Sequence, residues 1–112
     1  MRVKHAEQVP AEPVAIEGAT GVRMRRLIHE AEGAPNFYMR QFLLAPGGCT
    51  PSHAHAWEHE VYVLSGSGAV VAPDGQTPIG PGDCVYVAPM DLHQFLNTGQ
   101  EELRFLCLVP KG

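Results

Sequence analysis

The sequence predicts an all-β fold: one domain of short strands that form an antiparallel barrel or two packed sheets. Twelve glycines and ten prolines interrupt the 112 residues, so few stretches are long enough for three helical turns. The intervals are filled by apolar runs rich in β-branched and aromatic residues, several of which alternate in polarity. Many short strands separated by turn sequences are typical of small sandwiches and barrels, and this length suits one core.

Seven runs are predicted as strands. They cover residues 22–29, 37–45, 60–66, 68–72, 83–88, 93–97 and 103–109. The connections contain turn residues: 73–75 (PDG) is a hairpin signal, while 45–48 (APGG) and 80–83 (GPGD) are predicted as tight turns. These seven runs and their turns define a barrel domain over residues 22–112.

The last predicted strand is apolar on both faces. One face carries Leu103, Phe105, Cys107 and Val109; the other carries Arg104, Leu106 and Leu108. The first face can line the barrel. The second face would be exposed to solvent unless another segment or subunit covers it. We therefore predict a homodimer, with residues 1–21 as an N-terminal arm or edge strand at the dimer interface. The alternative is that the arm covers its own barrel.

Composition excludes several classes of partner. A formal net charge of −4 argues against a nucleic-acid partner, since phosphate binding needs a basic face. No run of eighteen apolar residues exists to span a membrane, and the first thirteen residues lack the apolar core of a secretory signal. The three cysteines are widely spaced and odd in number, which fits a reducing, cytoplasmic location without disulfides.

Histidines are concentrated in one short segment. His53, His55 and His59 lie within seven residues, half of all the histidines in the chain. Residues two apart on a strand face the same way, so these three rings project together if the backbone stays extended between them. Three neutral bases buried together would each need a partner, and a metal ion supplies it. The segment is therefore predicted to bind a metal.

These residues resemble the first motif of the cupin superfamily, G-x5-H-x-H followed by a ligand position and a glycine. Here the motif reads Gly47, five residues, His53, Ala54 and His55, and it ends at Gly66. The second cupin motif resembles residues 82–97, with matches at His93 and Asn97; Ala88 and Met90 stand where a proline and a glycine are usual. The resemblance implies a jelly-roll barrel, with His93 as the fourth metal ligand.

The family spacing permits two residues at the ligand position usually held by glutamate. His59 lies three residues beyond His55 with six before Gly66, and Glu60 lies four beyond with five before. The interval to Gly66 favours His59, as does its parity with His53 and His55. We predict ligation by His53, His55, His59 and His93, with Glu60 as the alternative ligand.

The resemblance is to small bacterial cupins in which four histidines hold manganese in a homodimeric barrel. It implies Mn(II) first and Fe(II) second, while Zn, Ni, Co and Cu also bind imidazole. Four neutral ligands leave the full +2 charge on the ion, and an octahedral ion would keep two open positions. Because ligation needs neutral imidazole, we expect metal loss below about pH 6.

This chemistry favours a metal-dependent, dioxygenase-like oxidoreductase that acts on a small organic molecule. The alternative is a cupin that binds or senses a small molecule without catalysis. No general base is evident, so the metal would carry most of any chemistry. Side chains that parity or position places near the metal are predicted to form the substrate pocket: Arg40, Phe95, Phe105, Cys107 and Trp57.

Overall fold

The computed structural model describes all residues, 1–112, and contains nine strands and two short 3-10 helices. The strands are β1 (Glu12–Pro13), β2 (Thr20–Ile28), β3 (Phe37–Cys49), β4 (His59–Ser65), β5 (Gly68–Ala72), β6 (Gly75–Ile79), β7 (Cys84–Val87), β8 (Gln94–Asn97) and β9 (Leu103–Pro110). The helices are η1 (Ala6–Gln8) and η2 (Glu30–Glu32). No helix is long and apolar enough to cross a membrane.

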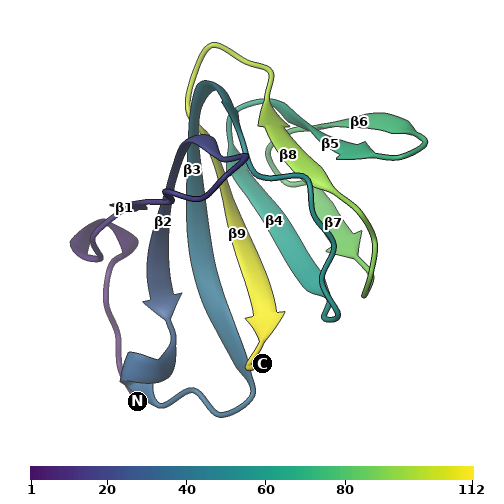
Figure 1. Ribbon diagram of the computed structural model, residues 1–112. Helices are drawn as coiled ribbons and strands as arrows, with labels where there is room; N and C mark the ends of the chain where they lie inside the picture. Colours follow the sequence, from purple (N-terminus) through teal and green to yellow (C-terminus); the bar gives the residue numbers. More distant parts are fainter.

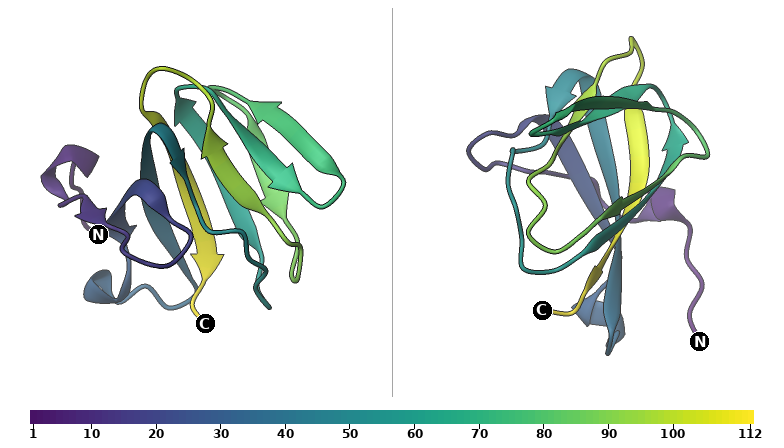
Figure 2. Two further views of the ribbon diagram at one scale, coloured as in Figure 1. Left: turned by 45° about the horizontal axis from the view of Figure 1, so that its top comes forward. Right: turned by 90° about the vertical axis from the view of Figure 1, so that its right-hand side faces the viewer.

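All pairings between the strands are antiparallel, and they form one curled sheet. The order is β6-β5-β8-β3-β9-β4-β7, with β2 on the other side of β3 and β1 beside β2. In Figure 1, β2, β3, β9, β4 and β7 follow one another from left to right, β8 lies at the right, and the β5–β6 hairpin projects to the upper right. The view from the side shows how the sheet curls into a barrel (Figure 2). The predicted all-β barrel is confirmed.

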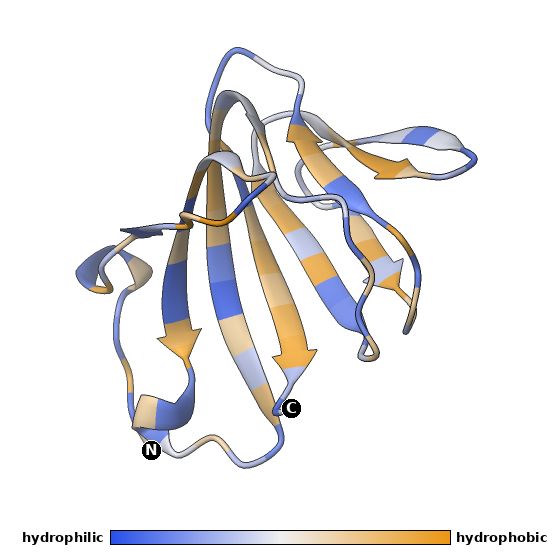
Figure 3. Cartoon of the chain, viewed as in Figure 1, coloured by the Kyte–Doolittle hydropathy of each residue, from blue (hydrophilic) through white to orange (hydrophobic).

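Alternation decides which face of each strand enters the core. On β9, the residues from Leu103 to Val109 at odd positions are buried, and those between them are half-buried. Figure 3 shows β9 mostly in the orange of hydrophobic residues, whereas β2 and β3 mix orange and blue. The inward residues join one cluster with Leu44, Val61 and Val63. Burying each such side chain stabilises the fold by about 1.5–3 kcal/mol.

Two parts of the strand prediction need correction. Residues 45–48, predicted as a tight turn, continue β3 as far as Cys49, and Gly47 adopts a positive φ of 77° within the strand. Residues 75–79 form β6, which was not predicted as a strand because all but Ile79 are exposed and show no alternation. The hairpin signal at 73–75 is confirmed, since Ala72 pairs with Gly75.

The N-terminal arm packs on its own barrel. β1 pairs with Arg23 and Met24 of β2. Glu7 accepts hydrogen bonds from Arg25 at 3.0 Å and from Arg104 at 3.1 Å. These contacts tie the arm to the edge of the sheet. They also place the later residues of the arm near the barrel opening.

The homodimer remains a prediction. Tyr62, Leu64 and Tyr86 are exposed on the outer face of β4 and β7, beside the half-buried Leu106 and Leu108 of β9. A second copy seated on this face would cover it. Sedimentation is expected to give about twice the chain mass of 12.1 kDa, and a mass near 12.1 kDa would exclude the dimer.

Two glycines with left-handed backbone provide a test of the fold. Gly66 has φ +90°, and a Cβ there would lie 2.6 Å from the carbonyl oxygen of Glu102. Gly47 has φ +77° with open space around it. Gly47→Ala is expected to cost about 1–2 kcal/mol from conformation alone. Gly66→Ala is expected to cost about 2 kcal/mol more, because the backbone must also move. Urea unfolding of both variants measures the difference, and equal costs would contradict this account.

Candidate metal centre and ligand cavity

Two backbone hydrogen bonds join the segments that carry the histidines. The amide of His53 donates to the carbonyl of His93, and the amide of His93 donates back, both at 3.1 Å. Thr50 extends this pairing, since its amide donates to the carbonyl of Phe95 and its hydroxyl accepts from the amide of Phe95, both at 2.9 Å. Segments forty residues apart are therefore held in fixed register at the barrel opening.

Four imidazole rings face one another in a closed ring. The centroid distances in order are 4.1 Å from His53 to His55, 5.2 Å to His59, 5.1 Å to His93 and 5.4 Å back to His53. The chain does not stay extended between His55 and His59, as the parity argument assumed. It bends at Ala56 and Trp57, and this bend turns the His59 ring toward the other three.

The nitrogen atoms of these rings fall into two groups. On His93, Nδ1 contacts the carbonyl of Asp91 at 2.9 Å, and on His59, Nδ1 contacts the Cys107 sulfur at 3.5 Å. These contacts engage Nδ1 of each ring and leave Nε2 as the nitrogen that could bind a cation. The Nε2 atoms of His53 and His55 are 3.0 Å apart, and the buried Nε2 of His59 has no hydrogen-bond partner. The protein atoms alone do not gather three or more donors into a finished cation site.

Burial favours the neutral form of His53, His55 and His59. It is the main cause that lowers the pKa of His59 from its usual 6.5 to about 4, with smaller contributions from His93 and Arg40. Burial also lowers the pKa values of His53 and His55. Neutral imidazole is the form that binds a metal ion.

This shift predicts how the stability of the metal-free protein depends on pH. Between pH 6.5 and 4 the unfolded chain protonates His59 and the folded chain does not, so stability is complete above 6.5 and falls as the pH drops through this window. The urea midpoint of EDTA-treated protein is therefore expected to be lower at pH 4.5 than at pH 7. His59→Gln should flatten this dependence, and an unchanged slope in that variant would contradict the assignment.

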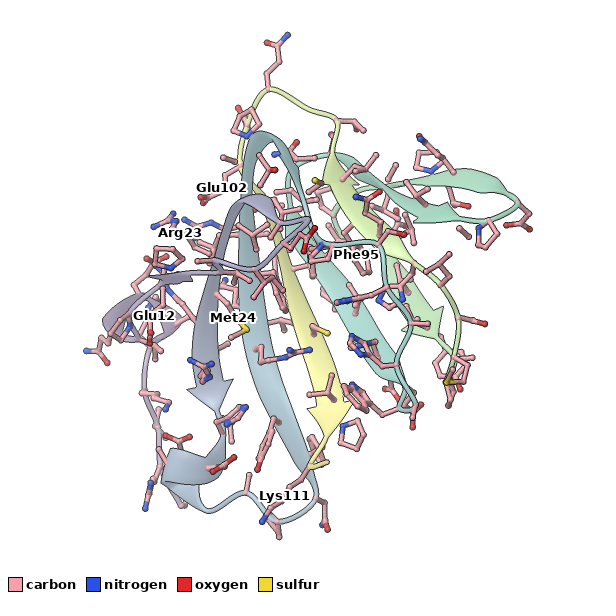
Figure 4. All side chains as sticks on the ribbon, viewed as in Figure 1. Glu12, Arg23, Met24, Phe95, Glu102 and Lys111 are labelled. Carbon is pink, nitrogen blue, oxygen red and sulfur yellow. The ribbon has the colours of Figure 1, made fainter.

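The four histidine rings line part of a cavity of about 260 Å³. The other residues that line it are Val14, Ile16, Val22, Met24, Arg40, Phe42, Thr50, Pro51, Trp57, Phe95, Phe105 and Cys107. Met24 on β2 and Phe95 on β8 reach it from different parts of the sheet (Figure 4). The wall contains no aspartate or glutamate, so the imidazoles, the Cys107 thiol and Arg40 are its ionisable groups.

The structure brings together most of the residues that the sequence nominated. Arg40, Phe95, Phe105 and Cys107 line the cavity, and Trp57 stacks on His55 with 4.5 Å between the centroids. Glu60, the alternative ligand, is exposed on the outer face of β4, away from the cavity. Sequence reasoning missed the arm residues Val14 and Ile16, because no local pattern shows that the arm folds over the opening.

Comparison with known proteins decides the family. Residues 40–109 match the cupin domain family. This chain is a cupin. An oxalate-binding protein from Thermotoga maritima is 30% identical over 112 residues, which cover 97% of this chain and 93% of that protein. The structure is also similar to that of the polyketide cyclase RemF from Streptomyces resistomycificus. The TM-score is 0.95 and the identity 37%, over 100% of this chain and 80% of the other.

Other relatives match only in part. A 1-methylthio-D-xylulose 5-phosphate methylsulfurylase from Rhodospirillum rubrum is 32% identical over 71 residues, which make up 63% of this cupin and 46% of that protein. The cupin spans about half the length, or less, of the first curated relatives that it matches. The relatives differ in their named activities, as expected of a barrel that supports many reactions.

Proposed function

We propose that this cupin is a divalent-metal-dependent enzyme that acts on a small, planar organic molecule bearing oxygen. The observation that carries the proposal is the closed ring of imidazoles, in which the buried Nε2 of His59 lacks a partner. Such an unpaired polar atom costs about 1–3 kcal/mol, and a cation would remove that cost. His53, His55, His59 and His93 would hold the ion, with Mn(II) first and Fe(II) second.

The spacing of two of these donors supports such an ion. Two nitrogens bound at about 2.1 Å to one ion, at a right angle, lie about 3.0 Å apart. The Nε2 atoms of His53 and His55 have that separation. The Nδ1 contacts of His59 and His93 engage one nitrogen of each of the other two rings, so Nε2 would be the donor to the ion. An all-imidazole set suits Mn, Fe, Co, Ni, Cu and Zn, and is a poor match for Ca or Mg.

When bound, a divalent ion supplies Lewis acidity to an oxygen of the substrate. The chain's own residues would do the rest. Val14 and Ile16 of the arm, together with the phenylalanines of the cavity, exclude water from the bound molecule. Exclusion of water strengthens every electrostatic contact inside. Since no carboxylate lines the wall and all four imidazoles would hold the ion, proton transfer would fall to the Cys107 thiol or the substrate itself.

Ring closure of a polycarbonyl compound is the reaction with the stronger support. The polyketide cyclase RemF resembles this cupin over the whole of this chain and 80% of its own, at 37% identity. Forming a carbon–carbon bond between two parts of one molecule needs a polarised carbonyl oxygen and a folded substrate. A mostly apolar cavity beside a cation would provide both conditions.

Oxidation of a small organic molecule, in a dioxygenase-like reaction, is the second candidate. The nitrogen-only donor set favours it, because neutral ligands stabilise the reduced, divalent state of Mn or Fe that such reactions need. Ring closure involves no electron transfer. The metal dependence therefore separates the two candidates.

The test uses protein purified without nickel and loaded separately with Mn(II), Fe(II) or Zn(II). Each sample is incubated with linear polycarbonyl compounds and with phenols, while products are followed by mass spectrometry and oxygen by an electrode. Cyclisation with zinc and without oxygen uptake would support ring closure, whereas oxygen uptake with Mn or Fe alone would support oxidation. His55→Ala should abolish either reaction without unfolding the protein. Tight binding without turnover would instead indicate a non-catalytic binding cupin.

A further inference from the structure

Arg40 differs from the other arginines in what surrounds it. Arg23, Arg25, Arg26 and Arg104 each pair with a glutamate, and Arg2 donates to the carbonyl of Ala31. Arg40 has no oxygen partner. Its Nη2 donates to the Cys107 sulfur at 3.2 Å, its Cζ lies 5.1 Å from the centre of the Phe42 ring, and its buried Nε has no partner.

The contrast with Arg25 on the neighbouring strand is informative. Arg25 is buried, whereas Arg40 is half-buried and only its Nε is fully enclosed. Arg25 donates to the carbonyl of Val9, the amide oxygen of Gln41 and the carboxylate of Glu7, at 2.9–3.0 Å. Its guanidinium is satisfied by the fold and ties the arm to β2. A guanidinium has five N–H donors that match the two oxygens of an oxyanion, and leaving any of them buried and unpaired, as Arg40 Nε is, costs free energy. The environment of Arg40 therefore calls for an acceptor that the protein does not supply.

The cavity around Arg40 restricts what that acceptor is. A row of stacked aromatic rings forms one wall: Phe42 and Phe105 lie 5.3 Å apart at 18°, and Phe105 and Phe95 lie 4.8 Å apart at 30°. A flat apolar body packs well against such a wall. With no carboxylate in the lining, a bound anion meets no like charge. The volume of about 260 Å³ is near the lower limit for small-molecule sites.

Arg40 also lies close to the four histidine rings. Cys107 contacts Arg40 at 3.2 Å on one side and His59 at 3.5 Å on the other, so a single thiol separates the guanidinium from the proposed metal ligand. An oxygen held by Arg40 would place the adjoining part of a small molecule beside the four histidines.

We propose that Arg40 binds an anionic oxygen, as carboxylate, phenolate or enolate, of a planar aromatic ligand stacked on the phenylalanine wall. This assignment deepens the proposed function, because it names the ligand class of the same cavity. Arg40 is then the residue that selects acidic molecules over neutral ones of the same shape. Charge-assisted hydrogen bonds of this kind correspond to a preference of about tenfold or more.

The test compares 2-naphthoate with its neutral amide, 2-naphthamide, by isothermal titration calorimetry. EDTA-treated full-length protein is used, so that no metal ion contributes to carboxylate binding. The wild type is expected to bind the acid about tenfold more tightly than the amide. Arg40→Met should bring the two affinities together, with the amide affinity unchanged. Arg40→Lys, which keeps the charge and loses the fork, should retain an intermediate preference.

Arg26→Gln is the matched control. Arg26 lies opposite Arg40 in the β2–β3 register but is exposed and does not line the cavity. It should keep the full preference for the acid. Arg40→Met should also unfold at the same urea concentration as the wild type or a higher one, since it removes an unpaired buried donor. The proposal fails if wild type binds neither compound or shows no preference, or if Arg40→Met keeps it. These failures are separate from that of the metal proposal, which metal titration decides.

Discussion

His59→Ala is expected to weaken the binding of divalent transition metals by about 100-fold or more. Four-ligand zinc sites in proteins are worth about 10–16 kcal/mol at neutral pH, so each ligand accounts for about 3 kcal/mol. His59 is buried, with 6% of its surface exposed, and its Nε2 has no other partner. The loss is measured by competition with a chromogenic chelator, with zinc and manganese titrated separately.

Glu60→Ala is the matched control for this loss. Glu60 follows His59 directly in the chain and is the residue that family spacing offers as the alternative ligand. Its exposed position on the outer face of β4 predicts unchanged metal affinity. Loss of metal in Glu60→Ala, together with retention in His59→Ala, would reverse the assignment. If both variants kept the wild-type metal affinity, the four histidines would not be the metal site.

The fold was predictable from the sequence where burial of one strand face makes apolar residues alternate along the chain. β9 and β4 alternate between the core and the outer face, and both strands were predicted near their observed bounds. β6 was missed because it lies at the sheet edge and buries only Ile79, so hydrophobicity along it has no period of two. The extension of β3 past Pro46 was missed because two glycines usually mark a turn, and here they let the strand continue to Cys49.

The candidate site was predictable where short motifs set it. The spacing of three histidines nominated His53, His55 and His59, and the resemblance to the second cupin motif nominated His93, although the chain bends between His55 and His59. Contacts that depend on the tertiary fold left no local signal. The pairing of Cys107 with both Arg40 and His59 joins residues 67 and 48 positions apart. The arm residues at the cavity opening are placed by β1, which pairs through two residues only.

Phe105→Ala is expected to destabilise the protein by about 3–5 kcal/mol. The side chain is 1% exposed and stacks on Phe42 and Phe95, so its removal leaves a void that these neighbours cannot fill. A domain of this kind is stable by about 5–15 kcal/mol, so the loss is a large share of the total. Urea unfolding at pH 7 measures it, with Phe37→Ala as the control.

Phe37 is the same residue type at the start of β3, but it is 57% exposed. Its replacement is expected to cost less than about 1 kcal/mol. A similar cost for both variants would show that Phe105 is not a central packing residue. The large expected cost has a consequence for function, because Phe105 belongs both to the core cluster and to the cavity wall. The aromatic wall that would hold a ligand is therefore part of the packed core, so the fold itself sets the position of that wall relative to Arg40 and the four histidine rings.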